Sequence, residues 1–267
     1  MAFISTNDVI IKIASDRFTV GQILMVRGML AVAIFAVILL VKRWPVIPRV
    51  ALGKWNLIRA FCEAGATLLF VTGLTLLPIA TVSSLGWTSP ILVTMGAAFV
   101  LRERVTLGHW FAVLAGFTGV ILVTQPWGDT FSWAMLLPLG TAIFVCMREL
   151  VTKKIDQRVR SMHITLATLI VVTLMGLAMS IHQLPSLTGK DVMWLGTSAL
   201  LLSLGFLCQI TAIRSGDLSF IAPFSFSGIL FASIYGYLVW SDPYNLGMIC
   251  GFLLIVSAGI YLVTRRS

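Results

Sequence analysis

Residues 119–124 read Gly-Val-Ile-Leu-Val-Thr, and residues 259–264 read Gly-Ile-Tyr-Leu-Val-Thr. A charged pattern near the start of the chain recurs in the same way: Asn7-Asp8, Lys12 and Arg17 return as Arg148-Glu149, Lys153 and Arg158. We therefore predict a duplicated chain with two halves, residues 1–126 and 127–267. An apolar chain built from two structural repeats is typical of a transporter whose substrate site lies between the repeats.

The composition places most of the chain in lipid. Of its 267 residues, 58% are hydrophobic and only 11% are charged, and the mean hydropathy is +1.00. A helix needs about 20 apolar residues to cross the hydrocarbon core of a bilayer. We predict an all-α membrane protein with ten transmembrane helices, at residues 1–14, 19–42, 55–77, 79–101, 106–125, 131–155, 160–183, 190–213, 217–240 and 244–264.

The first predicted helix is short for a membrane span. At 1.5 Å per residue it would cover about 21 Å, whereas the hydrocarbon core is about 30 Å thick. Its repeat mate aligns Met1 with Ala142, so we expect either a start farther upstream or a clipped first helix. The N-terminus also lacks the basic region and cleavage site of a signal peptide.

The positive charges gather in alternate loops. Basic residues occupy the segments 43–54, 102–104, 153–160 and 265–266, whereas the intervening turns are nearly free of Lys and Arg. By the positive-inside rule the basic side is cytoplasmic, and both termini then lie inside. The net charge of +9 is thus a topology signal, and we expect no nucleic-acid partner.

Six charged residues fall well inside predicted helices: Asp8, Arg27, Arg59, Glu63, Arg148 and Glu149. A charge at such a depth costs about 2.5–3.5 kcal/mol, so it normally faces a cavity or a partner. One interpretation is a site; the other is simple neutralisation, with Asp8 paired to Lys12 and Arg59 paired to Glu63 four residues apart on one helix face.

The depths of these residues predict a common layer. Asp8, Arg27 and Trp87 each lie about 12 Å from the outer surface, and Glu63 approaches the same region from the cytoplasmic side. Glu149, the repeat mate of Asp8, is expected at the mirror depth. Acidic groups there suit proton binding and release, so Asp8, Glu63 and Glu149 are our candidates for proton coupling.

We predict a substrate site from the acids, their neighbours and polar residues of the second half: Asn7, Asp8, Arg27, Glu63, Trp87, Glu149, Gln209 and Ser225. Trp87 can stack a planar ligand or pack in the core. Gln209 and Ser225 can contact a ligand or make interhelical hydrogen bonds. Pro90 and Pro223 each free a carbonyl and are expected to kink or break a helix, as at many transporter sites.

The sequence gives little indication of metal binding, cofactor binding or catalysis. His109, His163 and His182 are not clustered, so we expect no metal site and no cofactor, and no nucleophile or P-loop motif is present. The four cysteines lie in apolar runs and are expected as core residues. Small residues recur every fourth position in the fifth and tenth helices. They indicate close packing within one protomer or, alternatively, a homodimer through those two helices.

The motifs that carry a family resemblance are Thr6-Asn7-Asp8 with Lys12, Val20-Gly21-Gln22, Arg27-Gly28, Arg59 with Glu63, Leu77-Pro78, Pro90, Leu101-Arg-Glu103, Gly116-Phe-Thr-Gly119, Ala222-Pro223, Gly236-Tyr237 and Asp242-Pro243. With these the chain resembles the EamA-type transporters of the drug/metabolite transporter superfamily. It departs from them at Arg102-Glu103 and Ser241-Asp242, where members usually have Gly-Glu.

The resemblance implies two inverted five-helix repeats in the inner membrane of a bacterium, surrounded by membrane lipid. It also implies a central cavity that opens to either side in turn and carries small organic metabolites. The first three helices are similar to members that handle riboflavin or S-adenosylmethionine.

We therefore expect a secondary transporter, not an enzyme, for a small polar metabolite that is zwitterionic or aromatic, coupled to protons. The mixture of acids and bases inside the membrane suits a ligand with both signs. The alternatives are a membrane-embedded enzyme or lipid-handling protein, and a pore or scaffold in which the buried charges are structural.

Overall fold

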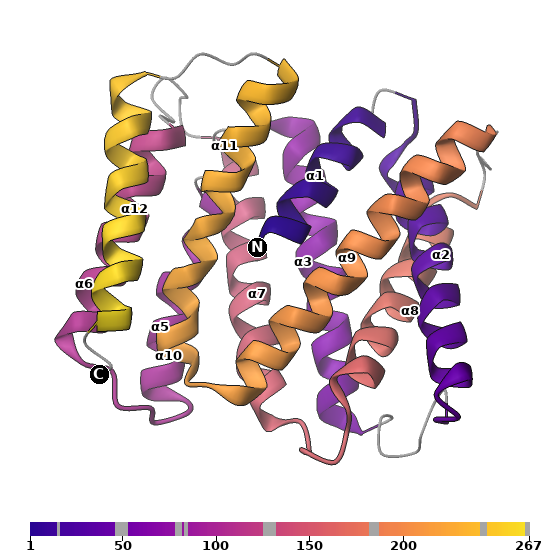
Figure 1. Ribbon diagram of the computed structural model, residues 1–267, viewed down its shortest axis with the longest axis horizontal. Coiled ribbons are helices and arrows are strands. Elements are labelled where there is room, and N and C mark those ends of the chain that lie inside the picture. Colours follow the sequence, from indigo (N-terminus) through magenta and orange to yellow (C-terminus); the bar gives the residue numbers. More distant parts are fainter. Residues whose placement is uncertain are drawn as a thin grey trace. The chain divides into compact units, whose positions relative to one another are not determined.

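The computed structural model describes residues 1–14, 17–45, 53–77, 82, 85–124, 132–181, 187–240 and 245–264. Within these ranges the chain is helical and has no strand (Figure 1). Each of the ten predicted ranges contains a helix, which confirms the all-α fold. The helices are α1 Ala2–Ala14, α2 Val20–Val41, α3 Lys54–Leu76, α5 Ser89–Phe99, α6 Leu107–Thr124, η2 Trp133–Met135, α7 Leu136–Lys154, α8 Ser161–Met179, α9 Gly189–Ser215, α10 Leu218–Ile221, η3 Ala222–Phe226, α11 Ser227–Trp240 and α12 Leu246–Thr264.

Helix length and composition agree with a multi-pass membrane protein. Among the described residues, five helical stretches are long and apolar enough to cross a membrane: Val20–Val41, Trp133–Lys154, Ser161–Met179, Gly189–Ser215 and Leu218–Tyr235. Shorter apolar helices occur at Ala2–Ile11, Ser89–Phe99, Leu107–Val123 and Leu246–Tyr261. The 23 residues of α3 are also long enough for a span, but this helix carries the charges of Arg59 and Glu63.

The limits of α2 follow from its sequence. Thr19 and Gln22 form a capping box: the Gln22 N–H donates to Thr19 Oγ1 at 3.5 Å, and the Thr19 N–H donates to Gln22 Oε1 at 3.0 Å. At the other end Arg43 has a φ of 53°, the left-handed conformation that commonly ends a helix.

The two internal prolines mark helix breaks. Pro90 lies in the first turn of α5, where a missing N–H costs nothing, so it starts a helix instead of kinking one. Trp87 therefore lies in the turn before α5, so the prediction of one continuous helix over residues 79–101 is wrong at this point. Pro223 lies in η3, which separates α10 from α11 and confirms a broken ninth span.

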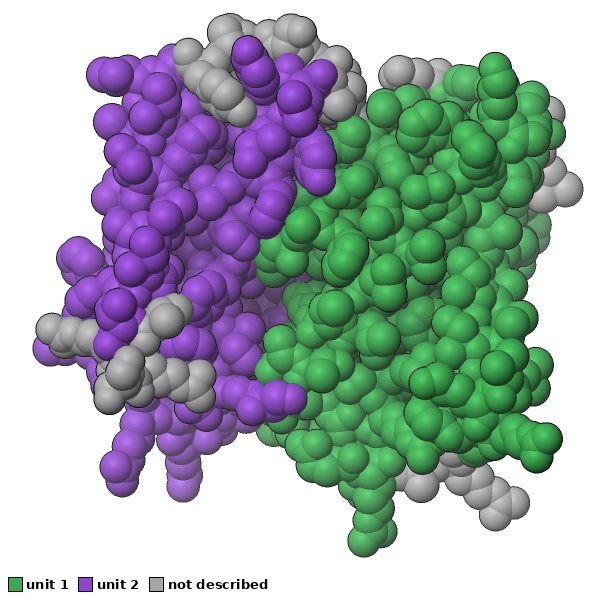
Figure 2. All heavy atoms as spheres, viewed as in Figure 1, with its two compact units in different colours: residues 1–64, 151–214 green, residues 65–150, 215–267 purple. Residues whose placement is uncertain are grey.

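The chain forms two compact units (Figure 2). Unit 1 comprises residues 1–64 and 151–214, and unit 2 comprises residues 65–150 and 215–267. Each unit takes segments from both predicted halves, and the division falls within α3 and within α7. The proposed repeat boundary at residues 126 and 127 stays a prediction.

In unit 1, α2 and α8 lie side by side at close range (Figure 1). A Cβ added to Gly176 of α8 would lie 2.6 Å from the backbone nitrogen of Met25, and one added to Gly28 of α2 would lie 2.1 Å from Thr173 Oγ1. Only glycine permits this separation of the helix axes. Beside this contact, α2, α8 and α9 share an apolar core of Ala31, Phe35, Leu39, Leu166, Leu169, Ala199, Leu202 and Phe206.

In unit 2, the small residues of α6 and α12 face each other. A Cβ on Gly119 would lie 2.7 Å from the carbonyl oxygen of Gly251, and a Cβ on Gly251 would lie 2.5 Å from that of Gly119. Packing within one chain thus accounts for the small-residue pattern around these two glycines. The homodimer through these helices stays a prediction.

The cysteines do not share one environment. Cys62 is buried, Cys146 is half-buried, and Cys208 and Cys250 are exposed. The expectation of four core residues is therefore wrong for Cys208 and Cys250. In lipid an outward-facing position is as apolar as a core position, so an apolar run does not distinguish them.

Candidate substrate site

A buried polar network joins α1, α2 and α9 in unit 1. The guanidinium of Arg27 donates through Nη1 to Asn7 Oδ1 at 3.2 Å, and the hydroxyl of Ser198 donates to the same oxygen at 2.6 Å. The amide nitrogen of Asn7 donates to Asp8 Oδ1 at 3.1 Å. Asn7 is 1% exposed, Ser198 0% and Arg27 6%, so these groups meet out of reach of solvent.

Two carboxylates act on the charge of Arg27. They belong to Asp8 and to Glu63, which is buried on α3. Asp8 itself is exposed, although Asn7 beside it is buried. The cation is therefore balanced by acids from two other helices, and one of these acids keeps an accessible carboxylate. This arrangement can present an acceptor and a donor to a small polar ligand.

A second buried arginine, Arg59 on α3, has different hydrogen-bond partners from those of Arg27. Arg59 is 1% exposed; its Nε donates to Thr152 Oγ1 at 3.0 Å, and its Nη1 donates to Thr168 Oγ1. These bonds tie α3 to the end of α7 and to α8 within unit 1. We interpret Arg59 as a structural residue.

Unit 2 holds the repeat mates of Asn7 and Asp8. Arg148 Nη2 and Glu149 Oε1 form an ion pair at 2.5 Å, with both residues buried on α7. Neighbouring side chains are thus hydrogen-bonded in both copies of the motif, by an amide in the first and by a guanidinium in the second. Glu149 has a basic partner at bonding distance, whereas Asp8 is bonded to a neutral amide.

The remaining predicted residues are spread over the units. Trp87 packs beside Phe226 in unit 2, with ring centroids 6.2 Å apart, and Ser225 lies half-buried in η3 of the same unit. Gln209 lies half-buried on α9 of unit 1. The structure therefore brings Asn7, Asp8, Arg27 and Glu63 together, while Trp87, Glu149 and Ser225 belong to the other unit. The side chain of Lys12 lies outside the described residues.

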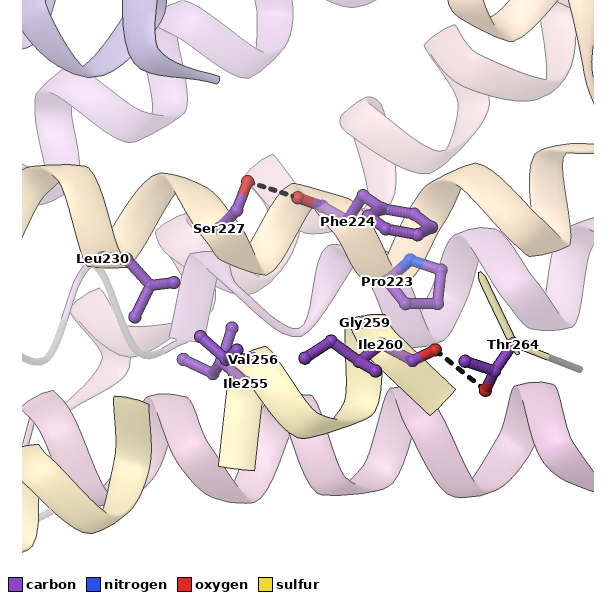
Figure 3. A pocket seen from close by; sticks show the side chains of 9 residues that line it. All are labelled: Pro223, Phe224, Ser227, Leu230, Ile255, Val256, Gly259, Ile260 and Thr264. Atoms are coloured by element: carbon purple, nitrogen blue, oxygen red, sulfur yellow. Dashed lines mark hydrogen bonds between the residues drawn. The ribbon is translucent and has the colours of Figure 1, made fainter. Parts of the chain in front are cut away.

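An apolar groove lies elsewhere in unit 2 and is distinct from the predicted site. It has a volume of about 350 Å³ and is lined by Pro223, Phe224, Ser227, Leu230, Ile255, Val256, Gly259, Ile260 and Thr264 (Figure 3). Its two hydroxyl groups donate to nearby backbone carbonyls: Ser227 to Phe224 of η3 at 2.7 Å, and Thr264 to Ile260 of its own helix at 3.1 Å. The surface left for a ligand there is almost entirely apolar.

Three residues that hydrogen-bond these buried groups were not predicted: Ser198, which bonds Asn7, and Thr152 and Thr168, which bond Arg59. Nothing in the sequence separates them from the many Ser and Thr side chains that bond their own helix, as Thr197 does to the carbonyl of Met193. Among the described residues, no three His, Cys, Asp or Glu side chains gather closely enough to hold a metal ion.

Comparison with known proteins identifies the class. The model of the EamA-like transporter family matches residues 1–125 and 132–265, which together make up nearly the whole chain. The chain therefore belongs to the EamA-like transporter family, and the two matches fit a chain made of two repeats. It is a multi-pass membrane transporter, not an enzyme.

Several curated relatives carry named substrates. The chain is 29% identical over 215 residues to a riboflavin transporter of Vibrio cholerae, covering 77% of this chain and 70% of the relative. It is 30% identical over 205 residues to a riboflavin transporter of Rhizobium johnstonii, covering 74% and 66%. It is 22% identical over 194 residues to an S-adenosylmethionine uptake transporter of Rickettsia bellii, covering 72% and 66%.

A solved crystal structure has the same fold. It superposes with a TM-score of 0.81 at 17% identity, covering 99% of this chain and 94% of the other. At this identity the likeness concerns the fold alone.

Proposed function

We propose that this protein is a secondary transporter that carries a small polar metabolite with an aromatic ring across a bacterial inner membrane by alternating access. Riboflavin is the first candidate, and S-adenosylmethionine is the second. The proposal rests above all on the buried network of Arg27, Asn7 and Ser198 beside the accessible carboxylate of Asp8. The riboflavin and S-adenosylmethionine transporters among the relatives support the choice of ligands.

The ligand chemistry agrees with that network. A riboflavin molecule has a flat ring with hydrogen-bond donors and acceptors on its edge and no net charge. A guanidinium donates only and a carboxylate accepts only, so Arg27 and Asp8 together can satisfy both kinds of group.

We also propose that transport is coupled to the proton gradient through protonation of an acid on a membrane-spanning helix. Asp8 is the first candidate because its carboxylate is exposed and bonded to a neutral amide. Glu63 and Glu149 are the others, and each is buried beside an arginine. A buried acid that is paired to a base holds its charge more firmly than one bonded to an amide.

Transport into proteoliposomes tests this function. Purified protein is reconstituted, a proton gradient is imposed, and the uptake of labelled riboflavin and labelled S-adenosylmethionine is measured side by side against protein-free vesicles. We expect accumulation of riboflavin that an ionophore collapses. Uptake of neither compound above the protein-free rate would reject both ligands, and accumulation that survives the ionophore would reject proton coupling.

A further inference from the structure

The carboxamide of Asn7 stands between a base and an acid. Its oxygen receives Arg27 Nη1 at 3.2 Å and the Ser198 hydroxyl at 2.6 Å, and its nitrogen donates to Asp8 Oδ1 at 3.1 Å. Every polar atom of the amide thus has a partner on a defined side. Asn7 is 1% exposed, so water does not compete with these bonds.

The chemistry of the partners fixes the orientation of this amide. A guanidinium can only donate, so the group that faces Arg27 must be the oxygen. An ionised carboxylate can only accept, so the group that faces Asp8 must be the nitrogen. A flipped amide would set donor against donor at one end and acceptor against acceptor at the other. Ser198 reinforces the observed orientation with a second donor to the oxygen.

Because the amide lies between them, Arg27 and Asp8 both keep bonding capacity. The Nε of Arg27 is buried and has no hydrogen-bond partner among the residues that the structure describes. Asp8 is exposed. A buried donor without an acceptor is costly, typically by about 1–3 kcal/mol, so a ligand that supplies the acceptor is favoured.

We infer that the site recognises the –C(=O)–NH– edge of a heterocyclic ring, with the ligand carbonyl accepting from Arg27 and the ligand N–H donating to Asp8. Such an edge has the same adjacent acceptor and donor that the Asn7 amide already places between these two residues. Ser198 is then a positioning residue, since it holds the amide that keeps the base and the acid apart. The inference rests on the proposed function and narrows its substrate class.

This inference separates the two ligand candidates. The pyrimidine part of the riboflavin ring carries an imide, which has a ring N–H between two carbonyls. The adenine ring of S-adenosylmethionine has no carbonyl and offers no such edge. The site should therefore prefer ring imides and lactams to adenine derivatives.

Binding of matched ligand pairs to the purified full-length protein tests the inference. The pairs are riboflavin with 3-methylriboflavin, and uridine with 3-methyluridine, in which a methyl group replaces the imide proton. Dissociation constants are measured by ligand-dependent thermal stabilisation, which rises with the ratio of ligand concentration to Kd. We expect methylation to weaken binding at least about tenfold, since a hydrogen bond to a charged group is lost.

Variants test the positioning role. In Ser198→Ala the unmethylated ligand should lose affinity and the preference for it over the methylated partner should shrink. Thr197→Ala is the matched control, because Thr197 is the exposed neighbour on α9 whose hydroxyl bonds its own helix. It should retain both the affinity and the preference.

The outcomes distinguish this inference from the proposed function. Equal binding of the methylated and unmethylated form in each pair overturns the inference, while riboflavin remains a ligand. Discrimination in the uridine pair without any binding of riboflavin supports the inference and rejects riboflavin as substrate. Failure of all four compounds to bind overturns the inference.

Discussion

The contact between α2 and α8 gives the sharpest prediction about stability. A Cβ on Gly176 would lie 2.6 Å from the backbone nitrogen of Met25, 2.8 Å from Leu24 Cβ and 2.9 Å from the Leu24 carbonyl carbon. Two of these three atoms belong to the backbone, so Gly176→Ala must push the helices apart. Overpacking of this kind costs about 1–3 kcal/mol.

The same change at another helical glycine should have the opposite effect. Gly196 lies on α9 of the same unit, and the nearest atom to its added Cβ is Leu30 Cδ1 at 4.0 Å. Alanine is favoured over glycine inside a helix by about 1 kcal/mol, so Gly196→Ala should be neutral or stabilising. Both variants replace a helical glycine by alanine, so the gain in helix propensity is the same in each. The difference between their stabilities therefore reports the packing alone.

Thermal unfolding in detergent measures the difference. For a chain of this size, 1 kcal/mol corresponds to about 2–4 °C in Tm. We expect Gly176→Ala to melt several degrees below Gly196→Ala, and Gly196→Ala to melt at or above the temperature of the unchanged protein. Equal melting temperatures for the two variants would refute the close approach of α2 and α8.

Three further changes probe single contacts. Arg59→Ala removes the donors to Thr152 and Thr168 and should lower the free energy of unfolding by about 1.5–3 kcal/mol in a denaturant titration; an unchanged midpoint would contradict its structural role. Glu103→Ala removes the acceptor that receives the N–H groups of Leu218 at 3.0 Å and Ser219 at 2.9 Å, so it should lower Tm, whereas Glu103→Gln, which retains an acceptor oxygen, should lower it less. Asp8→Asn, which keeps an acceptor oxygen but loses the charge, should bind riboflavin more weakly and lose gradient-driven accumulation at every pH, even at saturating riboflavin. The exposed control Asp217→Asn should accumulate riboflavin normally, and accumulation by Asp8→Asn equal to that of the unchanged protein would remove Asp8 from the coupling.

The sequence predicts the helices well because an apolar run of membrane length has few alternatives in lipid. The predicted range 19–42 became α2 at Val20–Val41, and 106–125 became α6 at Leu107–Thr124. The fourth predicted range, 79–101, agrees less well with the structure. Pro90 was expected to bend a helix, but proline fits a first turn better than an interior, and the helix begins at Ser89.

The candidate site was predictable only where it is charged. Asp8, Arg27 and Glu63 stand out because a charge inside a span is expensive, and these three are brought together. Ser198 does not stand out, since a hydroxyl can bond the preceding turn of its own helix at little cost. Its role depends on which face of α9 meets Asn7, and a helix that is apolar on every side gives no pattern from which to predict that face.

The central claim is that Arg27 and its network bind the transported ligand. The most direct measurement is the equilibrium binding of riboflavin to the purified protein, followed by quenching of flavin fluorescence, for the unchanged chain, for Arg27→Gln, and for Arg17→Gln as control. Arg17 is an exposed arginine whose side chain is 59% accessible and pairs with Asp191 at 3.0 Å. The account predicts that Kd rises at least about tenfold in Arg27→Gln and stays unchanged in Arg17→Gln. Riboflavin binding by Arg27→Gln with the affinity of the unchanged protein would contradict it.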